Sequence, residues 1–175
     1  MKASKTLIGL TKPKSPTNVG AVMRAAGCYG VDGVFYTGTR YPRAAKYQTD
    51  THQSNQSIPL QGVERLLDCL PKGMQLVCVE LALGATPLPE FEHPDQAMYV
   101  FGPEDGTIGQ AVIDRADAVV YVPTRGCMNL AATVNVVLYD RLAKSDLSFA
   151  NDQLIRDSRD INNKSKTRPL ADRSS

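Results

Sequence analysis

Short apolar runs alternate along this chain with segments whose apolar residues recur at helical spacing. Five of the runs are rich in apolar and β-branched residues and short enough to be buried strands. They cover residues 6–10, 33–38, 74–81, 97–102 and 118–123. Strands that alternate with helices indicate an α/β fold, with a mostly parallel sheet and helices on both faces.

Four segments are predicted as helices because their apolar residues recur every three or four positions. They cover residues 18–29, 60–70, 108–115 and 129–144. Thr17 or Asn18 is a suitable N-cap for the first helix, because the helical pattern starts just after Pro16. Residues 38–57 are polar and aromatic without a clear period, so we predict a long loop there.

Composition divides the chain into a domain and a tail. Residues 1–148 are long enough to bury the core of one domain, whereas residues 149–175 are polar and basic, with one short helix expected around 152–159. No apolar run approaches the roughly 20 residues that span a bilayer, and the N-terminus has no signal-peptide pattern. We therefore expect a cytoplasmic protein without a membrane segment.

Cysteine and histidine are too scattered for a metal site. The four cysteines, at positions 28, 69, 78 and 127, form no pair at metal-ligand spacing, and the two histidines lie at positions 52 and 93. We expect no metal, and the apolar neighbours of the cysteines indicate buried free thiols. The net charge of +2 neither requires nor excludes nucleic acid as a partner.

Three segments place polar side chains beside glycine or proline close to a predicted strand, where ligands collect in open α/β sheets. The first, residues 15–30, carries Asn18, Gly20 and Arg24. Its small residues keep the predicted helix slim and allow close approach of another backbone. The local pattern by itself favours a packing helix with an exposed arginine.

The second segment ends a strand in the sequence GPEDG at residues 102–106. Such a turn exposes backbone groups to a ligand. Glu104 and Asp105 are equally suited to cap the helix that follows.

The third segment, residues 120–142, ends a strand at Pro123, passes through Gly126 and begins a long helix at Asn129. Asn129 fits a simple N-cap there. Neither GxGxxG nor GxxxxGK[ST] occurs in the chain, so a dinucleotide-binding fold and a P-loop have no support.

The order and spacing of these segments resemble the motifs of the TrmH (SpoU) family of RNA methyltransferases in the SPOUT superfamily. The first reads N-x-G-x-x-x-R from residue 18, the second places F-G-P-E after a strand, and the third joins V-P to M-N-L and a helix ending in V-L-Y-D. The match runs from about residue 7 to residue 142 and looks closest to the short, single-domain members similar to TrmL.

The resemblance implies a SPOUT fold with a trefoil knot near the C-terminus and S-adenosylmethionine (SAM) as cofactor. The loops at 99–109 and 121–130 would form the knot and hold SAM. Cofactor contacts carry over to Glu80, Leu81, Gly102, Val122, Cys127, Met128 and Leu130. Cys127 and Ala131 stand where the family usually has serine, and a thiol is a weaker hydrogen-bond partner than a hydroxyl.

The same resemblance implies a catalytic set of Asn18, Arg24, Glu104 and Asn129, and a homodimer in which the partner completes each site. A ribose 2′-hydroxyl is a poor nucleophile, so a neighbouring group must take its proton or stabilise the alkoxide. Arg24 is the family's candidate. Since arginine stays protonated, we expect it to hold the target phosphate or ribose and stabilise the oxyanion, and a general-base role would need an unusual environment.

RNA is the expected substrate, with tRNA ahead of ribosomal RNA because short relatives tend to act on tRNA. The candidate RNA-binding residues are Arg24, Arg40, Arg43 and Lys46, and tyrosines among the last three offer rings on which bases stack. The stretch around them is equally compatible with an ordered surface loop. A SAM- or RNA-binding protein without catalysis remains open, and the first motif argues against a base methyltransferase of another SPOUT branch.

Overall fold

The computed structural model describes residues 4–46 and 58–167. Its contacts divide the chain after Lys144 into two compact units, Met1–Lys144 and Ser145–Ser175, whereas composition placed the division at residue 148. The described part of the second unit contains the helix α5 (Asp152–Ser158), close to the range expected from the sequence. The side-chain oxygen of Asn151 caps this helix.

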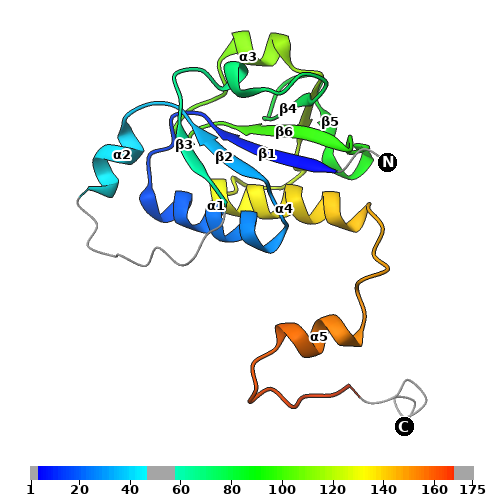
Figure 1. The fold of residues 1–175 in the computed structure, drawn as a ribbon. Helices are drawn as coiled ribbons and strands as arrows, with labels where there is room; N and C mark the ends of the chain where they lie inside the picture. The colour runs from blue at the N-terminus through cyan, green and yellow to red at the C-terminus, as the bar shows by residue number, and fades with distance from the viewer. Residues whose placement is uncertain (1–3, 47–57, 168–175) are drawn as a thin grey trace. The chain divides into compact units, whose positions relative to one another are not determined.

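Seven parallel strands form one sheet in the first unit (Figure 1). Across the sheet they run β3 (Leu60–Gly62), β2 (Gly33–Tyr36), β1 (Lys5–Leu10), β6 (Gln96–Phe101), β4 (Gln75–Val79), β7 (Ala118–Tyr121) and β5 (Thr86–Pro87). Each neighbouring pair is parallel, so all the carboxyl ends lie at the same edge. The predicted α/β fold with a parallel sheet is confirmed.

Helices cover both faces of this sheet (Figure 1). The helical segments of the first unit are α1 (Pro16–Cys28), α2 (Arg40–Ala45), α3 (Gln110–Arg115), α4 (Leu130–Ala143) and the 3-10 turns η1 (Leu66–Cys69) and η2 (Leu88–Glu90). Alternate strand residues face opposite sides: Val77 and Val79 join the core under α1 and α4, and Leu76 and Cys78 join the core under α3 and η1. This alternation explains why the strand sequences are apolar without interruption.

The helix predicted over residues 60–70 is wrong. The backbone of Leu60–Gly62 pairs in parallel with β2, and only Leu66–Cys69 forms a short 3-10 turn. Leu60 packs against the core under α1, whereas Val63 and Leu67 pack against the opposite core. Pairing with the sheet edge therefore overrides an apolar spacing that looked helical.

The loop predicted over residues 38–57 contains the helix α2, and residues 47–57 lie outside the described part of the chain. Tyr41 anchors α2 by packing edge-on against Tyr36 of β2, with ring centroids 5.0 Å apart. The helix is only six residues long, so it left no periodic signal in the sequence. The two-residue strand β5 is likewise too short to show a period.

Two finer predictions also need correction. The N-cap of α1 is Ser15 rather than Thr17 or Asn18, because its hydroxyl accepts a hydrogen bond from the backbone N–H of Asn18 at 3.3 Å. Of the four cysteines only Cys78 is fully buried, and burial raises the pKa of its thiol to about 12. Cys28 and Cys127 are exposed.

A partly buried polar network fastens α4 to the loop before β6. His93 lies between the hydroxyl of Tyr99, 2.6 Å from its Nδ1, and the carboxylate of Asp140, 2.8 Å from its Nε2. Arg141 donates to the Tyr99 hydroxyl at 3.1 Å, and Lys144 forms an ion pair with Asp140 at 2.8 Å. With Asp140 ionised, the neutral imidazole donates from Nε2 and accepts from Tyr99 at Nδ1, so each ring nitrogen is satisfied.

The pH dependence of stability should report on this network. Burial lowers the pKa of His93 below its ordinary value, although the contact with Asp140 opposes the shift. The unfolded chain therefore takes up a proton more readily than the folded protein, and the free energy of unfolding should fall as the pH drops from about 6.5 towards the lowered folded pKa, by at most about 1.4 kcal/mol per pH unit.

Denaturant titrations at a series of pH values between about 7.5 and about 5 measure this slope. His93→Gln keeps an amide donor and acceptor but does not titrate, so its stability should vary less over the same range. An unchanged slope in this variant would show that another group causes the loss.

Candidate functional site

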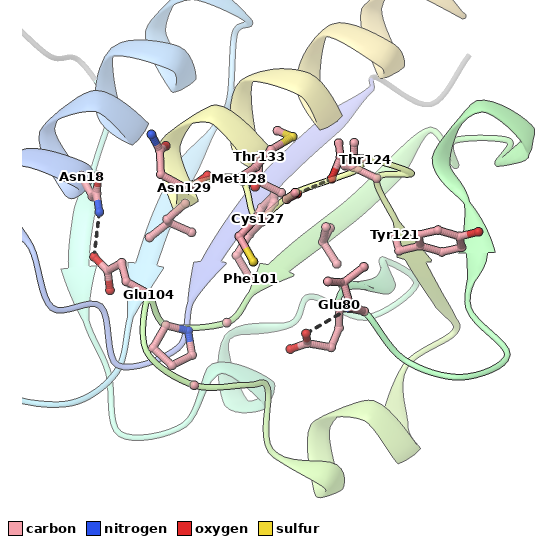
Figure 2. A pocket seen from close by; sticks show the side chains of 18 residues that line it. Asn18, Glu80, Phe101, Glu104, Tyr121, Thr124, Cys127, Met128, Asn129 and Thr133 are labelled. Carbon is pink, nitrogen blue, oxygen red and sulfur yellow. Dashed lines mark hydrogen bonds between the residues drawn. The ribbon is translucent and has the colours of Figure 1, made fainter.

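A pocket of about 490 Å³ opens at the carboxyl ends of β4, β6 and β7 (Figure 2). Its walls are the residues that follow these three strands, the start of α4, and Asn18 from α1. The parallel arrangement brings these segments to one edge of the sheet, which is where α/β sheets bind ligands. Its volume lies within the range of about 300–1,000 Å³ that is usual for small-molecule sites.

All seven cofactor positions carried over from the family motifs line this pocket. They are Glu80, Leu81, Gly102, Val122, Cys127, Met128 and Leu130. The pocket also contains side chains that sequence reasoning missed, among them Phe101, Tyr121, Thr124 and Thr133. Phe101 and Tyr121 are the last residues of β6 and β7, and the carboxyl ends of parallel strands are where ligands bind, so the sequence could have indicated them. Nothing in the local sequence indicated Thr133.

Glu80 ties together two loops that border the pocket. One carboxylate oxygen accepts a hydrogen bond from the backbone N–H of Leu81 at 3.0 Å, and the other accepts from the N–H of Ile108 at 2.9 Å. A Cβ atom at Gly102 would lie 3.2 Å from this second oxygen. Glycine at position 102 therefore allows the loop after β6 to pass directly over Glu80.

Glu104 joins the loop after β6 to the start of α1. Its Oε1 accepts a hydrogen bond from the side-chain amide of Asn18 at 3.0 Å (Figure 2). The same oxygen accepts from the backbone N–H of Ser15 at 3.1 Å, and Oε2 accepts from the N–H of Lys14 at 2.9 Å. Partial burial alone would raise the pKa of Glu104. The hydrogen bonds from Asn18 and from the backbone outweigh this effect, so the pKa lies below its ordinary value and the carboxylate is charged at neutral pH.

Asp105, the next residue, binds Arg40 of α2. The Nη1 of Arg40 lies 2.9 and 2.7 Å from the two carboxylate oxygens, and its Nη2 donates to the carbonyl of Lys12 at 2.6 Å. The bond from Arg40 holds the pKa of Asp105 below its usual value. Neither Glu104 nor Asp105 caps α3, because that helix begins after Gly109 without a side-chain cap. The alternative prediction that these two acids act as helix caps is therefore wrong.

Asn129 is the N-cap of α4, as its position predicted. Its Oδ1 accepts a hydrogen bond from the backbone N–H of Ala132 at 2.7 Å, and its carbonyl accepts from the hydroxyl of Thr133 at 2.9 Å. Leu130 and Ala131 are buried directly after the cap. Buried packing of these two residues fixes the start of α4 against the pocket.

The structure does not bring every candidate residue to the pocket. Arg24 is exposed on α1 between the buried residues Met23 and Ala25, and it does not line the pocket. Arg43 and Lys46, at the end of α2, are exposed and also lie outside it. Of the expected catalytic set, Asn18, Glu104 and Asn129 line the pocket and Arg24 stands apart.

Within residues 4–46 and 58–167, no three His, Cys, Asp or Glu side chains gather in a way that would hold a metal ion. None of the helices in this part of the chain is both long and apolar enough to cross a bilayer.

A parallel α/β sheet with a pocket at the carboxyl ends of its strands, closed by the N-terminus of a helix, defines a class of ligand-binding α/β proteins. Comparison with family profiles narrows this class, because residues 5–139 match the SpoU rRNA Methylase family. The match covers most of the chain, and the chain belongs to this family. No curated protein matches it by sequence.

Solved structures share this fold. An AdoMet-bound rRNA methyltransferase from Sinorhizobium meliloti is 20% identical with a TM-score of 0.68, over 81% of this chain and 57% of that one. The SpoU methyltransferase AviRb from Streptomyces viridochromogenes, in complex with AdoMet, is 19% identical with a TM-score of 0.67, over 82% and 59%. This chain therefore spans less than two thirds of either relative.

A third solved structure, described as giving insights into 2-OH methylation of C/U34 on tRNA, is similar over nearly its full length. It is 21% identical to this chain with a TM-score of 0.66, over 81% of this chain and 96% of that chain. At these identities the likeness shows a shared fold.

Proposed function

We propose that this protein transfers a methyl group from SAM to a ribose 2′-hydroxyl of RNA, with tRNA as the leading substrate. One observation carries the proposal: a single pocket collects all seven expected cofactor positions together with Asn18, Glu104 and Asn129. These residues come from four separate parts of the chain, so their convergence is a property of the fold and not of local sequence.

The pocket suits SAM in size and chemistry. Val122, Met128 and Leu130 offer apolar surface for an adenine ring, and the loops after β6 and β7 offer backbone groups for its polar edges. Gly102 keeps one wall free of a side chain. Bound SAM supplies an electrophilic methyl group on a sulfonium centre.

The residues around the pocket have separate tasks in this proposal. Asn18, oriented by the charged Glu104, faces the space where the acceptor ribose would approach the cofactor pocket. Arg24 is the electrostatic group that holds the target phosphate or ribose and stabilises the developing oxyanion. Because Arg24 lies outside the pocket of its own chain, it would reach the ribose of a substrate bound across α1, including one bound to a partner's pocket.

We infer a homodimer from the surface of α1 and α4. Val136 and Tyr139 on α4 are 37% and 61% exposed, and a Cβ atom added to Gly20 or Gly27 on α1 would meet nothing within 4 Å. An apolar, slim helix pair of this kind suits burial against a second copy. Sedimentation velocity should give twice the chain mass, and a monomer at micromolar concentration would contradict the inference.

We further propose that the two segments 99–109 and 121–130, which contribute to the pocket, form the knot implied by the family. Their joint contribution to the pocket supports this proposal. An experimental structure in which the chain after Tyr121 does not thread the loop after β6 would exclude the knot. The reaction is expected in the cytoplasm, which cell fractionation would test.

We place tRNA first because a solved structure described on tRNA is similar to this chain over 96% of its own length. Ribosomal RNA is the alternative, in line with the rRNA methyltransferase from Sinorhizobium meliloti. A SAM- or RNA-binding protein without catalysis is the second alternative. It is favoured by Cys127 and Ala131, which replace the serines usual in the family; Cys127 lines the pocket, so a hydroxyl is missing from its wall.

The test is methyl transfer from labelled SAM to total tRNA and to rRNA, each isolated from cells that lack the protein, followed by nucleoside analysis. A 2′-O-methylated nucleotide in one pool would establish the reaction and the substrate class together. Base methylation would contradict the proposed acceptor. SAM binding without transfer to either pool would favour the non-catalytic alternative.

A further inference from the structure

Arg40 connects two segments that lie far apart in the sequence. Its Nη1 contacts both carboxylate oxygens of Asp105, at 2.9 and 2.7 Å, and its Nη2 contacts the carbonyl of Lys12 at 2.6 Å. Asp105 belongs to the pocket loop Pro103–Gly106, and Lys12 belongs to the segment between β1 and α1. The guanidinium therefore uses two of its nitrogens to hold two chain segments.

The backbone at Lys12 needs such support. Lys12 has φ of 44°, and it is the non-glycine residue with a positive φ among those described. This left-handed conformation is unfavourable for a residue with a Cβ atom. The hydroxyl of Thr37 accepts a hydrogen bond from the N–H of Lys12 at 3.1 Å, and Gly38 leaves room for its backbone, since a Cβ atom there would lie 3.3 Å from the Lys12 Cα. Arg40 completes this support at the carbonyl.

The turn at Lys12 determines where the start of α1 lies. It directs the backbone N–H groups of Lys14 and Ser15 to the carboxylate of Glu104 at 2.9 and 3.1 Å, and Ser15 in turn caps α1. Within the first turn of that helix, the side chain of Asn18 reaches the same carboxylate at 3.0 Å. Glu104 and Asp105 are adjacent, so displacement of Asp105 must also displace the group that orients Asn18.

We propose that Arg40 is a positioning residue for methyl transfer, which holds the Lys12 turn and the pocket loop Pro103–Gly106 together so that Asn18 meets Glu104 at the rim of the cofactor pocket. This differs from the direct contact with RNA phosphate that the sequence suggested for Arg40. The expected change in the methyl-transfer rate depends on the proposed function being correct. The structural effects of removing Arg40 can be measured without RNA.

The kinetic test uses Arg40→Ala, Asp105→Ala and the double variant, with Arg115→Ala at the exposed end of α3 as the matched control. Both single variants should lower kcat by a similar factor, on the order of 10- to 100-fold, with little change in KM for RNA. The double variant should be no worse than either single one, because both remove the same link. Arg40→Lys should retain part of the rate, because lysine keeps the positive charge but lacks the planar guanidinium that donates from two nitrogens.

Asp105 separates positioning from RNA binding. If Arg40 bound a phosphate, Arg40→Ala would raise KM for RNA and lower the salt dependence of binding by about one counterion. Asp105→Ala would then remove a nearby negative charge and leave RNA binding equal or tighter. That pair of results would overturn the proposal.

Hydrogen exchange provides the readout that does not depend on activity. Arg40→Ala and Asp105→Ala should each speed amide exchange at Lys14 and Ser15, the two N–H groups bound to Glu104, and Arg115→Ala should not. The midpoint of thermal unfolding should change little, because an exposed ion pair contributes little to stability. Unchanged exchange at both amides would reject the positioning role even if RNA methylation is established. Faster exchange without any RNA methylation would reject the proposed function and keep the structural link.

Discussion

Replacement of Arg24 with alanine is expected to abolish methyl transfer while SAM binding survives. Arg24 is exposed on α1 and does not line the pocket, so its removal leaves the cofactor walls intact. A guanidinium that stabilises the oxyanion acts mainly in the transition state, and loss of one such group lowers kcat by on the order of 10²–10³-fold. Single-turnover transfer rates and calorimetry with SAM measure the two effects separately.

Two controls sharpen this prediction. Arg24→Lys keeps the positive charge but cannot donate two parallel hydrogen bonds as a guanidinium does, so it should recover only part of the rate. Arg115→Ala removes an exposed arginine from the opposite face of the sheet, and should leave both quantities unchanged. Equal loss of SAM affinity in Arg24→Ala would contradict the division of tasks between α1 and the pocket.

Replacement of Glu104 with glutamine should impair both activity and stability. The carboxylate accepts three hydrogen bonds through two oxygens, and a glutamine side chain offers only one accepting oxygen. At least one donor at the start of α1 is left facing an amide NH₂ group. We expect the free energy of unfolding to fall by about 1–3 kcal/mol and the transfer rate to fall further, since Asn18 loses its orientation.

The pH dependence of this effect has a definite sign. Hydrogen bonds lower the pKa of Glu104 in the folded protein, so its stabilisation is present above the ordinary glutamate pKa and is lost as the pH falls through the lowered folded value. The stability difference between the parent and Glu104→Gln should therefore shrink in acid. Denaturant titrations measure it, with Glu64→Gln, an exposed glutamate outside the pocket, as the control. A normal transfer rate in Glu104→Gln would reduce Glu104 to a structural role.

The sequence predicts the central strands well because a parallel sheet buries both faces of each strand, which leaves uninterrupted apolar runs such as residues 76–79 of β4. It fails at Leu60–Leu70, where the choice between helix and strand depends on whether the edge of β2 is available. Local spacing carries no information about such a partner. The helix α2 was missed for a different reason, because its six residues are too few to show a helical period.

The candidate site shows a similar division. The expected cofactor positions came from motif resemblance, which carries information that periodicity does not, and one pocket gathers all of them. The partners of Glu104 and Asp105 could not be named, since Lys14, Ser15 and Arg40 lie 65–90 residues away along the chain. Local chemistry offered only helix capping for these two acids, and long-range contacts decided otherwise.

The two edges of the sheet limit how this protein can associate. β3 is three residues long and β5 is two, and β5 ends in Pro87, which has no N–H to offer a neighbouring strand. An added strand would find too few hydrogen-bonding groups on either side to pair stably. Within the described residues, these short edges disfavour growth by strand addition and the aggregation that follows from it. The proposed homodimer would then form through helices.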